Sequence, residues 1–470
     1  MNRSLKKQQR LLLVFWAAFC WSAWQTKISF PQVNTWQKAV EEGNRHRAQG
    51  RFAEAEKAHR LALAEAEKFG PEDPRLAESL NALAVLYDAS GRYAEADRLY
   101  QRAQTILEKA MGPEHPTVAV SLTNRARLYR HQGRFVEGEL LYRQALAILE
   151  KAQGSEHRNV AACLDELGML YLAQGRYPEV EPLLQRALRI QEEKGAGDHP
   201  DVAVTLNNLG MLRRAQGHYT EAESLFRRAL SIRKKALGPE HPEVAVVMNN
   251  LADIYHRSGQ LSEAQTLYRQ VTAILEKTLG PEHPDLAMAL KNLASVYRDQ
   301  HHYSQAELLY RRALGIEEKT LGENHTSTAL TVGNLAAIYA DQKKYDQAEI
   351  CYRRCLDIFE KVLGPMNTHV ATTLNNLATL YFKQHRYAEA EPLFRRAMAI
   401  QDESLGPNHP DLADLLRNYS LLLRKTNRKS EASAMDARAQ EILARNPADK
   451  SAGQTVDVQA LTHDRNPWRE

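Results

Sequence analysis

The stretch LGPEHP occupies Leu237–Pro242 and returns at Leu279–Pro284, and the related MGPEHP occupies Met111–Pro116. Nine such linkers can be aligned between residues 70 and 410, and each begins 42 residues after the previous one. A fixed period of this size indicates stacked supersecondary units rather than independent globular domains. The linker therefore decides the fold class.

One complete unit, His241 to Gly280, shows what the linker does. His241 and Pro242 suit the N-cap and first position of a helix, whereas Gly280 is a typical helix terminator. Ser258-Gly259 separates two apolar stripes that both have helical spacing. The first stripe is Val244, Met248, Leu251, Ala252 and Tyr255, and the second is Ala264, Leu267, Tyr268, Val271, Ile274 and Leu275. The linker thus ends one helix pair and starts the next.

The composition fits a soluble helical array. The 62 Lys+Arg residues against 58 Asp+Glu give a net charge of +4, which is not the pattern of a nucleic-acid-binding protein. The four cysteines have no zinc-like spacing, and we expect them to be small packing residues. They are Cys20, Cys163, Cys351 and Cys355.

The two ends of the chain differ from the repeats. Basic residues precede the apolar run Leu11–Trp24, so residues 1–30 resemble a secretory signal or an N-terminal membrane anchor. We therefore expect an exported or membrane-anchored protein, with an uncleaved leader on a cytoplasmic protein as the alternative. Residues 446–470 lack periodicity, which predicts a flexible tail.

The repeat unit resembles the tetratricopeptide repeat, in the 42-residue form of kinesin light chains. The packing positions of that motif are occupied by Leu206, Leu209, Gly210, Tyr219, Ala222, Phe226 and Ala229. The resemblance implies an all-α protein, a right-handed α-solenoid of about ten helix-turn-helix pairs over residues 31–445. The coiled coil that precedes the repeats in kinesin light chains has no counterpart here, so a motor-subunit role is not expected.

In tetratricopeptide arrays the first helix of each pair lines the concave side, and here one residue on that face is usually an amide. An amide has donor and acceptor groups and can pair with the backbone of an extended peptide. The alternative is that these amides bond between adjacent repeats. The row comprises Asn124, Asn208, Asn250, Asn292, Asn334, Asn376 and Asn418, with Glu166 in the remaining repeat.

Basic residues share the same face. If they converge, they favour an acidic or carboxylate-bearing partner, because arginine makes forked contacts with carboxylates. The alternative is a solvated face of mixed charge, since Asp165, Glu166, Asp253 and Asp341 lie among them. The basic residues are Arg127, Arg130, His131, Arg214, His256, Arg257, Lys291 and Arg298.

The sequence contains no signature of catalysis. Walker, G-x-S-x-G, H-E-x-x-H and EF-hand patterns are absent, and Gly195-Ala196-Gly197 falls in a linker. The linker histidines occur once per repeat, so we expect helix caps rather than metal ligands. We predict no enzyme activity, no cofactor and no metal site.

The leading hypothesis is therefore a scaffold that binds an extended peptide or a partner protein in its concave groove. The alternative is a structural or self-associating assembly factor tethered at a membrane through residues 1–30. The final pair carries polar Asp436 and Gln440 where inner repeats have apolar or small residues, which resembles a solubilising end cap.

Overall fold

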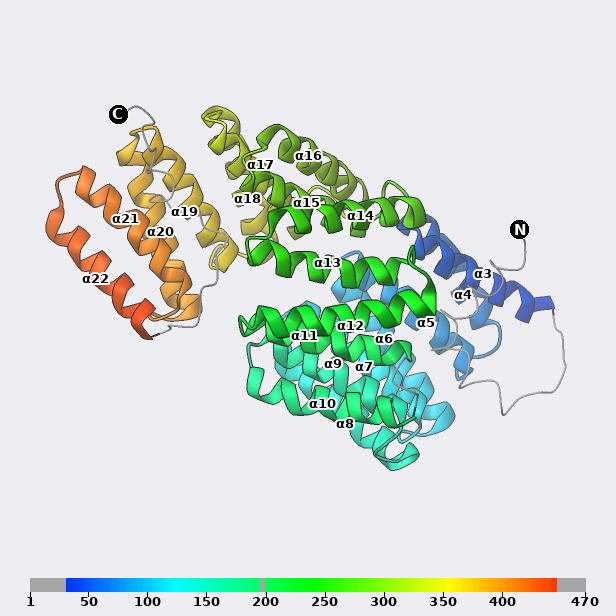
Figure 1. Ribbon diagram of the computed structural model, residues 1–470. Helices are drawn as coiled ribbons and strands as arrows, with labels where there is room; N and C mark the ends of the chain where they lie inside the picture. Colours follow the sequence, from blue (N-terminus) through cyan, green and yellow to red (C-terminus); the bar gives the residue numbers. More distant parts are fainter. Residues whose placement is uncertain (1–30, 195–198, 446–470) are drawn as a thin grey trace.

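The computed structural model describes residues 31–194 and 199–445, and within them the chain forms ten consecutive helix pairs and no strand. Pair 1 is α3–α4 and pair 10 is α21–α22, and Figure 1 shows them stacked in a curved array. In each pair the first helix is called A and the second B. The predicted α-solenoid of about ten pairs is confirmed.

The A helices are α3 (Pro31–Ala48), α5 (Pro74–Ala89), α7 (Pro116–His131), α9 (Arg158–Ala173), α11 (Pro200–Ala215), α13 (Pro242–Arg257), α15 (Pro284–Asp299), α17 (Thr326–Asp341), α19 (Thr368–Lys383) and α21 (Asp411–Lys425). The B helices are α4 (Phe52–Glu67), α6 (Tyr93–Met111), α8 (Phe135–Gln153), α10 (Tyr177–Lys194), α12 (Tyr219–Leu237), α14 (Leu261–Leu279), α16 (Tyr303–Thr320), α18 (Tyr345–Leu363), α20 (Tyr387–Leu405) and α22 (Lys429–Arg445).

Four features predicted from the sequence lie outside the described residues. These are the leader at 1–30, Cys20, the fragment Gly195-Ala196-Gly197 and the tail at 446–470. None of the helices that the structure describes has the length and apolar character needed to cross a bilayer.

Four residues of the linker LGPEHP have a structural role that can be identified. Gly238 ends α12 with a φ of 88°, a value that favours glycine. Glu240 pairs with Lys277 near the end of the next B helix, with an Oε2–Nζ distance of 2.6 Å. His241 Nδ1 accepts a hydrogen bond from the Glu243 amide at 3.2 Å, and Pro242 begins α13.

The histidine caps predicted from the sequence are confirmed. A ring Nδ1 accepts from the backbone amide two residues later in seven linkers, and Asp73 and Asn367 do the same with side-chain oxygens. The seven histidines are His115, His157, His199, His241, His283, His325 and His409.

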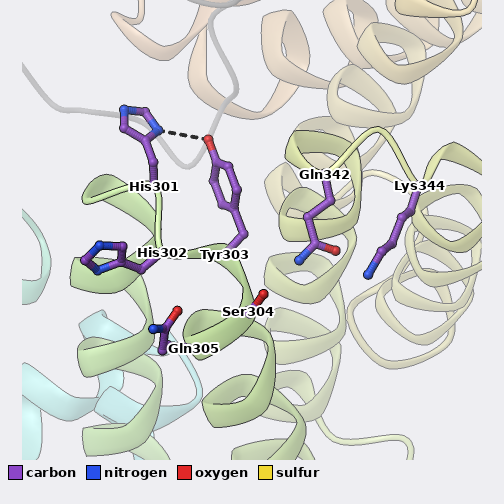
Figure 2. Close-up of a pocket in the computed structure, with 7 residues that line it drawn as sticks. All are labelled: His301, His302, Tyr303, Ser304, Gln305, Gln342 and Lys344. Atoms are coloured by element: carbon purple, nitrogen blue, oxygen red, sulfur yellow. Dashed lines mark hydrogen bonds between the residues drawn. The ribbon is translucent and has the colours of Figure 1, made fainter.

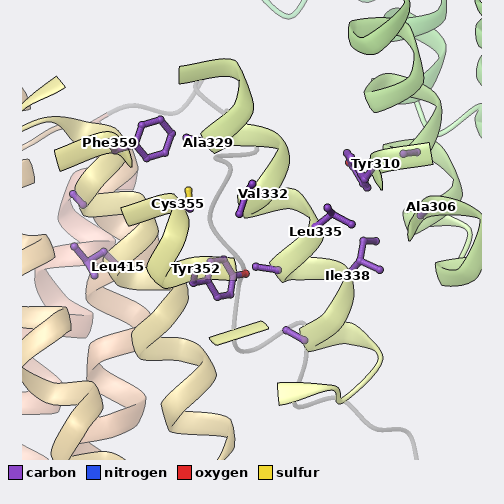
Figure 3. Packing of buried hydrophobic residues seen from close by; sticks show 14 of the residues in the cluster. Ala306, Tyr310, Ala329, Val332, Leu335, Ile338, Tyr352, Cys355, Phe359 and Leu415 are labelled. Atoms are coloured by element: carbon purple, nitrogen blue, oxygen red, sulfur yellow. The ribbon is translucent and has the colours of Figure 1, made fainter. Parts of the chain in front are cut away.

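One large side chain on each inner B helix fills the space between neighbouring pairs. In most repeats it is aromatic and almost completely buried, and Leu184 takes this place in α10. Figure 3 shows the packing around α16 to α18, where Tyr310, Val332, Tyr352 and Cys355 are buried. Cys163 is also buried, as expected for a packing cysteine. The aromatic residues are Tyr100, Tyr142, Phe226, Tyr268, Tyr310, Tyr352 and Phe394.

A second interaction joins most A helices to the preceding B helix. The hydroxyl of Tyr171 in α9 donates to Glu139 of α8 at 2.8 Å, and Tyr381 makes the same bond to Glu349 at 3.0 Å. Arginines surround these carboxylates and stack on the tyrosine rings, as Arg176 does on Tyr171. The recurring tyrosine therefore links repeats through a polar contact as well as by packing.

The side chains that bridge repeats show which side of the stack is concave. Successive A helices are joined by short amides, such as Asn250 Nδ2 to Asn207 Oδ1 at 2.7 Å. Successive B helices are joined by longer side chains, such as Arg354 to Glu318 at 2.6 Å. Two asparagines can bond only where two helices approach closely, and such short bonds join A helices, whereas the bonds between B helices are Arg–Glu or Arg–Asp pairs, so the A helices lie on the inner side of the curve.

The last pair ends the array with polar residues, as the sequence suggested. Asp436 occupies the place of the buried aromatic Phe394 and bonds to Arg424 within its own pair. Gln440 is exposed. Within residues 31–194 and 199–445, no repeat follows this pair.

We predict that the histidine caps make the array sensitive to acid. Burial lowers the pKa of His241, His283 and His325, so the unfolded chain binds more protons below about pH 6.5. Their stabilisation is complete above that pH and is lost as the pH falls through the folded-state pKa values. Replacing all three with asparagine, the cap at Asn367, should reduce the fall in melting temperature between pH 8 and pH 5.5.

Circular dichroism melts of both proteins provide the test. His59 remains in both as a common background, because burial lowers its pKa to about 4. Equal pH dependence in the two proteins would show that the caps do not carry the effect.

Candidate functional site

A surface hollow lies where the A–B turns of pairs 7 and 8 meet (Figure 2), with a volume of about 490 Å³. His301 Nδ1 and the Tyr303 hydroxyl lie 2.9 Å apart at its edge. His302, Ser304 and Lys344 also line it and are exposed. Ligand and catalytic sites are usually enclosed and largely apolar, so this open hollow is a poor candidate.

The inner wall formed by the A helices is a better candidate, because its side chains recur in rows. On α13, Val246, Asn250, Asp253 and Arg257 lie at positions i, i+4, i+7 and i+11, which share one helix face. Repetition along the stack gives an apolar row, an amide row and a charge row. The rows contain the equivalents of Val246, of Asn250, and of Asp253, His256 and Arg257, respectively, and Glu166 takes the amide position in its repeat.

The amide row is used in part to connect repeats. Asn250 donates to Asn207 at 2.7 Å, and Asn292 donates to Asn249 at 2.9 Å. Asn418 donates to Asn375 at 3.3 Å in the same way. The inter-repeat bonds that the sequence left as an alternative are therefore present. An amide nitrogen carries two hydrogens, so one such bond does not use its full capacity.

The members of the row differ in exposure. Asn124, Asn208 and Asn418 are buried, whereas Asn250, Asn292, Asn334 and Asn376 are half-buried. Pairs 6 to 9 therefore present more of their amides to the groove than the pairs on either side.

Asn208 belongs to a buried polar cluster around Asp165. The Asp165 carboxylate accepts from Thr205 at 2.6 Å, and from Asn208 and Gln191 at 3.3 Å. Burial raises the pKa of Asp165 to about 7 despite these bonds. The cluster orients Asn208 toward Asp165 rather than toward the groove.

Three repeats later the same positions hold Lys291, Glu317 and Thr331. Lys291 Nζ lies 2.6 Å from Glu317 Oε1, and Thr331 bonds the other carboxylate oxygen. Here a cation replaces Asp165, so the buried carboxylate has a direct counter-ion.

The charge row consists of ion pairs. Arg127 lies 2.7 Å from Glu166, and Arg214 lies 2.7 Å from Asp253 on the next A helix. Burial alone would raise the pKa of Glu166, but the adjacent Arg127 outweighs it and holds this pKa below its usual range. The wall is therefore a face of mixed charge in which the acidic residues are partners of the basic ones. The other pairs are Arg130–Glu166, Arg257–Asp253, His256–Asp299, Arg298–Asp341 and His131–Asp88.

The apolar row was not singled out from the sequence. Val246 is 51% exposed and Met288 is 47% exposed, and Val120 and Val204 are the other clearly exposed members. They lie one helical turn before the amides at the same 42-residue spacing. That shared spacing was the signal from which the row could have been found.

Metal binding gains no support from the residues that the structure describes. No group of three or more potential ligands comes together among them. The linker histidines instead lie one per repeat at helix starts.

The repeat is recognised by comparison with known proteins. A family model described as tetratricopeptide repeat matches residues 42–109, 89–151, 117–193, 163–235, 201–277, 273–319, 309–361 and 369–445. The chain belongs to the tetratricopeptide repeat family. Arrays of this family present extended concave binding surfaces, so the chain has the architecture of a protein-binding scaffold.

Several solved structures are similar to this array. A putative kinesin light chain with nearly identical repeats from Podosopora anserina shares 33% identity, with a TM-score of 0.37 over 44% of this chain and 98% of that chain. The quorum sensor NprR from B. thuringiensis shares 15% identity, with a TM-score of 0.52 over 78% and 98%. The Rap protein bound to Competence and Sporulation Factor shares 14%, with a TM-score of 0.51 over 79% and 97%. No curated relative matches the sequence.

We predict that Asp165→Asn stabilises the array at high pH. A raised carboxyl pKa means that the folded state keeps a proton that the unfolded chain has lost, so the contribution of Asp165 decreases as the pH rises through about 7. The variant should be more stable than the parent by about 1 kcal/mol or more at pH 8.5, with a smaller difference at pH 5.

Denaturant unfolding at both pH values measures this difference. Asp253→Asn is the control, because Asp253 is paired with Arg214 and Arg257 and should give no such gain. A less stable Asp165 variant at pH 8.5 would show that the ionised carboxylate supports the cluster.

Proposed function

We propose that this protein is a non-enzymatic scaffold whose inner wall holds an extended segment of a partner protein. The observation that carries the proposal is the apolar row, which leaves Val246 and Met288 about half exposed on the concave side. Asn250 and Asn292 lie one helical turn from them. Apolar contacts would supply affinity and the amides would pair with the peptide backbone.

The charges of the wall favour an uncharged segment over the acidic one that the sequence suggested. An acidic peptide would have to displace Asp253 from Arg214, or Asp341 from Arg298. Such an exchange replaces one ion pair by another and so contributes little net affinity. We therefore propose an extended segment with apolar and uncharged polar side chains.

The first test selects peptides from a display library against the full chain. We expect selected peptides to lose affinity by about tenfold or more for Val246→Ser with Met288→Ser, because two half-exposed apolar side chains are removed. The matched control is Leu308→Ser with Ile350→Ser, on the outer B helices. Those residues are 69% and 68% exposed, so the control removes as much surface from the other side.

Titration calorimetry of one selected peptide measures both its affinity for each variant and the salt dependence of that affinity. Equal affinity for the two variants would exclude the inner wall as the site. Repeating the titration at 0.05 and 0.5 M salt separates the partner classes, because an acidic segment would weaken strongly with salt and an uncharged one would not.

The leader supports a further part of the proposal, that the scaffold works outside the cytoplasm or at a membrane. The basic residues and apolar run within 1–30 support export or anchoring. Sequencing the mature N-terminus of native protein distinguishes cleavage from retention. The polar last pair disfavours the alternative of end-to-end self-association.

A further inference from the structure

The first two pairs touch linkers that follow much later in the chain. A Cβ on Gly50, in the turn of pair 1, would lie 2.8 Å from His283 Cδ2 and 3.2 Å from Pro284 Cδ. A Cβ on Gly91, in the turn of pair 2, would lie 3.2 Å from His325 Nε2. The first pair accordingly lies beside α14 and α15 in Figure 1. We call this contact the seam.

The seam keeps a constant register. Gly50 and His283 are 233 residues apart, and Gly91 and His325 are 234 residues apart. Two successive repeats thus meet two successive linkers between five and six repeats later. This is the contact expected where one turn of a superhelix stacks on the next.

Among the turn glycines of pairs 1 to 6, only Gly50 and Gly91 have such a neighbour. The equivalent glycines of pairs 3 to 6, which include Gly133 and Gly175, have no neighbouring atom within 4 Å of the added Cβ. His283 is buried, whereas His199 in an earlier linker is exposed. Backbone atoms of a glycine turn supply little apolar surface to this contact.

A cavity of about 370 Å³ connects the seam to the inner wall. Gly91 and His131 line it on one side, and Met288, Lys291 and His325 line it on the other. Met288 is also a member of the apolar row. The residues that hold the turns together and the residues proposed to hold a partner therefore share one space.

We propose that the seam is a clasp that closes the first superhelical turn around the inner wall and controls partner access. With the clasp closed, an extended chain enters only from an end of the turn. With it open, a segment enters from the side. This inference rests on the proposed function for the identity of the site, but the closure itself does not depend on any partner.

The chain offers a side chain that opens the seam without straining the turn. The same turn position holds His301 in pair 7 and His385 in pair 9, with φ values of 60° and 61°. Histidine is therefore accepted there. Gly50→His with Gly91→His places side chains against His283 and His325, whereas Gly133→His with Gly175→His makes the same change where space is open.

Small-angle scattering of the full chain without a partner gives the first readout. We expect a larger radius of gyration for the seam variant and an unchanged value for the control. This measurement needs no bound peptide, so it tests the closure even if the display selection fails. A seam variant with the radius of the control, or an equal expansion of both, overturns the clasp.

The second readout is the association rate of the display-selected peptide. This rate should rise about threefold or more in the seam variant and stay unchanged in the control variant. The reason is that the peptide can enter an open turn from the side without a preceding opening step. An unchanged association rate in the seam variant would show that the seam does not control partner access. If the histidine variant fails to fold by circular dichroism, the asparagine pair Gly50→Asn with Gly91→Asn replaces it, since Asn427 occupies this turn in pair 10 with a φ of 61°.

Discussion

The structure depends on one constraint, which is that a single helix pair cannot bury its own apolar face. The large side chain of each inner B helix, such as Phe226 or Tyr268, is buried only because the next pair covers it. Each repeat therefore stabilises its neighbour, and stability is a sum over nearly identical interfaces. The constant 42-residue spacing of the linkers follows from this constraint, because any insertion would move the next pair out of register with the one that it must cover.

Curvature follows from the polar contacts that surround this packing. Amide pairs such as Asn250–Asn207 hold the A helices close together, while pairs such as Arg354–Glu318 join the B helices over a wider gap. The closer approach of the A helices bends the stack in one direction. After between five and six repeats, the bend brings Gly50 against His283. Short-range side-chain lengths thus determine a contact between residues that are far apart in sequence.

The sequence predicted well whatever depends on one repeat and its neighbour. The glycine, histidine and proline of each linker signal a helix end, a cap and a helix start, and Gly238, His241 and Pro242 have these roles. The sequence predicted which helix face lines the inner wall, but not which side chains of that face are bonded to a neighbouring repeat. Whether Arg214 meets a ligand or Asp253 depends on the offset between neighbouring helices, which a helical wheel of one helix does not contain.

The seam could not be predicted, because no residue pattern marks Gly50 and Gly91 as different from the other turn glycines. Their surroundings arise from curvature accumulated over several repeats. The apolar row, in contrast, was within reach of the sequence. Val246 and Met288 follow the same spacing as the asparagines, but a valine in a helix suggests the core until its exposure is known.

The polar contacts between repeats also explain why we expect a partner to bind the least polar part of the inner wall. The charges are already engaged in ion pairs between A helices, so a partner that used them would compete with those pairs, whereas each amide nitrogen keeps a second hydrogen for a peptide carbonyl. The apolar row bridges no neighbouring repeats through hydrogen bonds or ion pairs. A segment that covers Val246 and Met288 therefore gains contact area while leaving the inter-repeat bonds intact. A partner can then bind without disturbing the shape of the array. Met288 belongs both to the apolar row and to the seam cavity, so partner binding and contact between the superhelical turns involve the same residue.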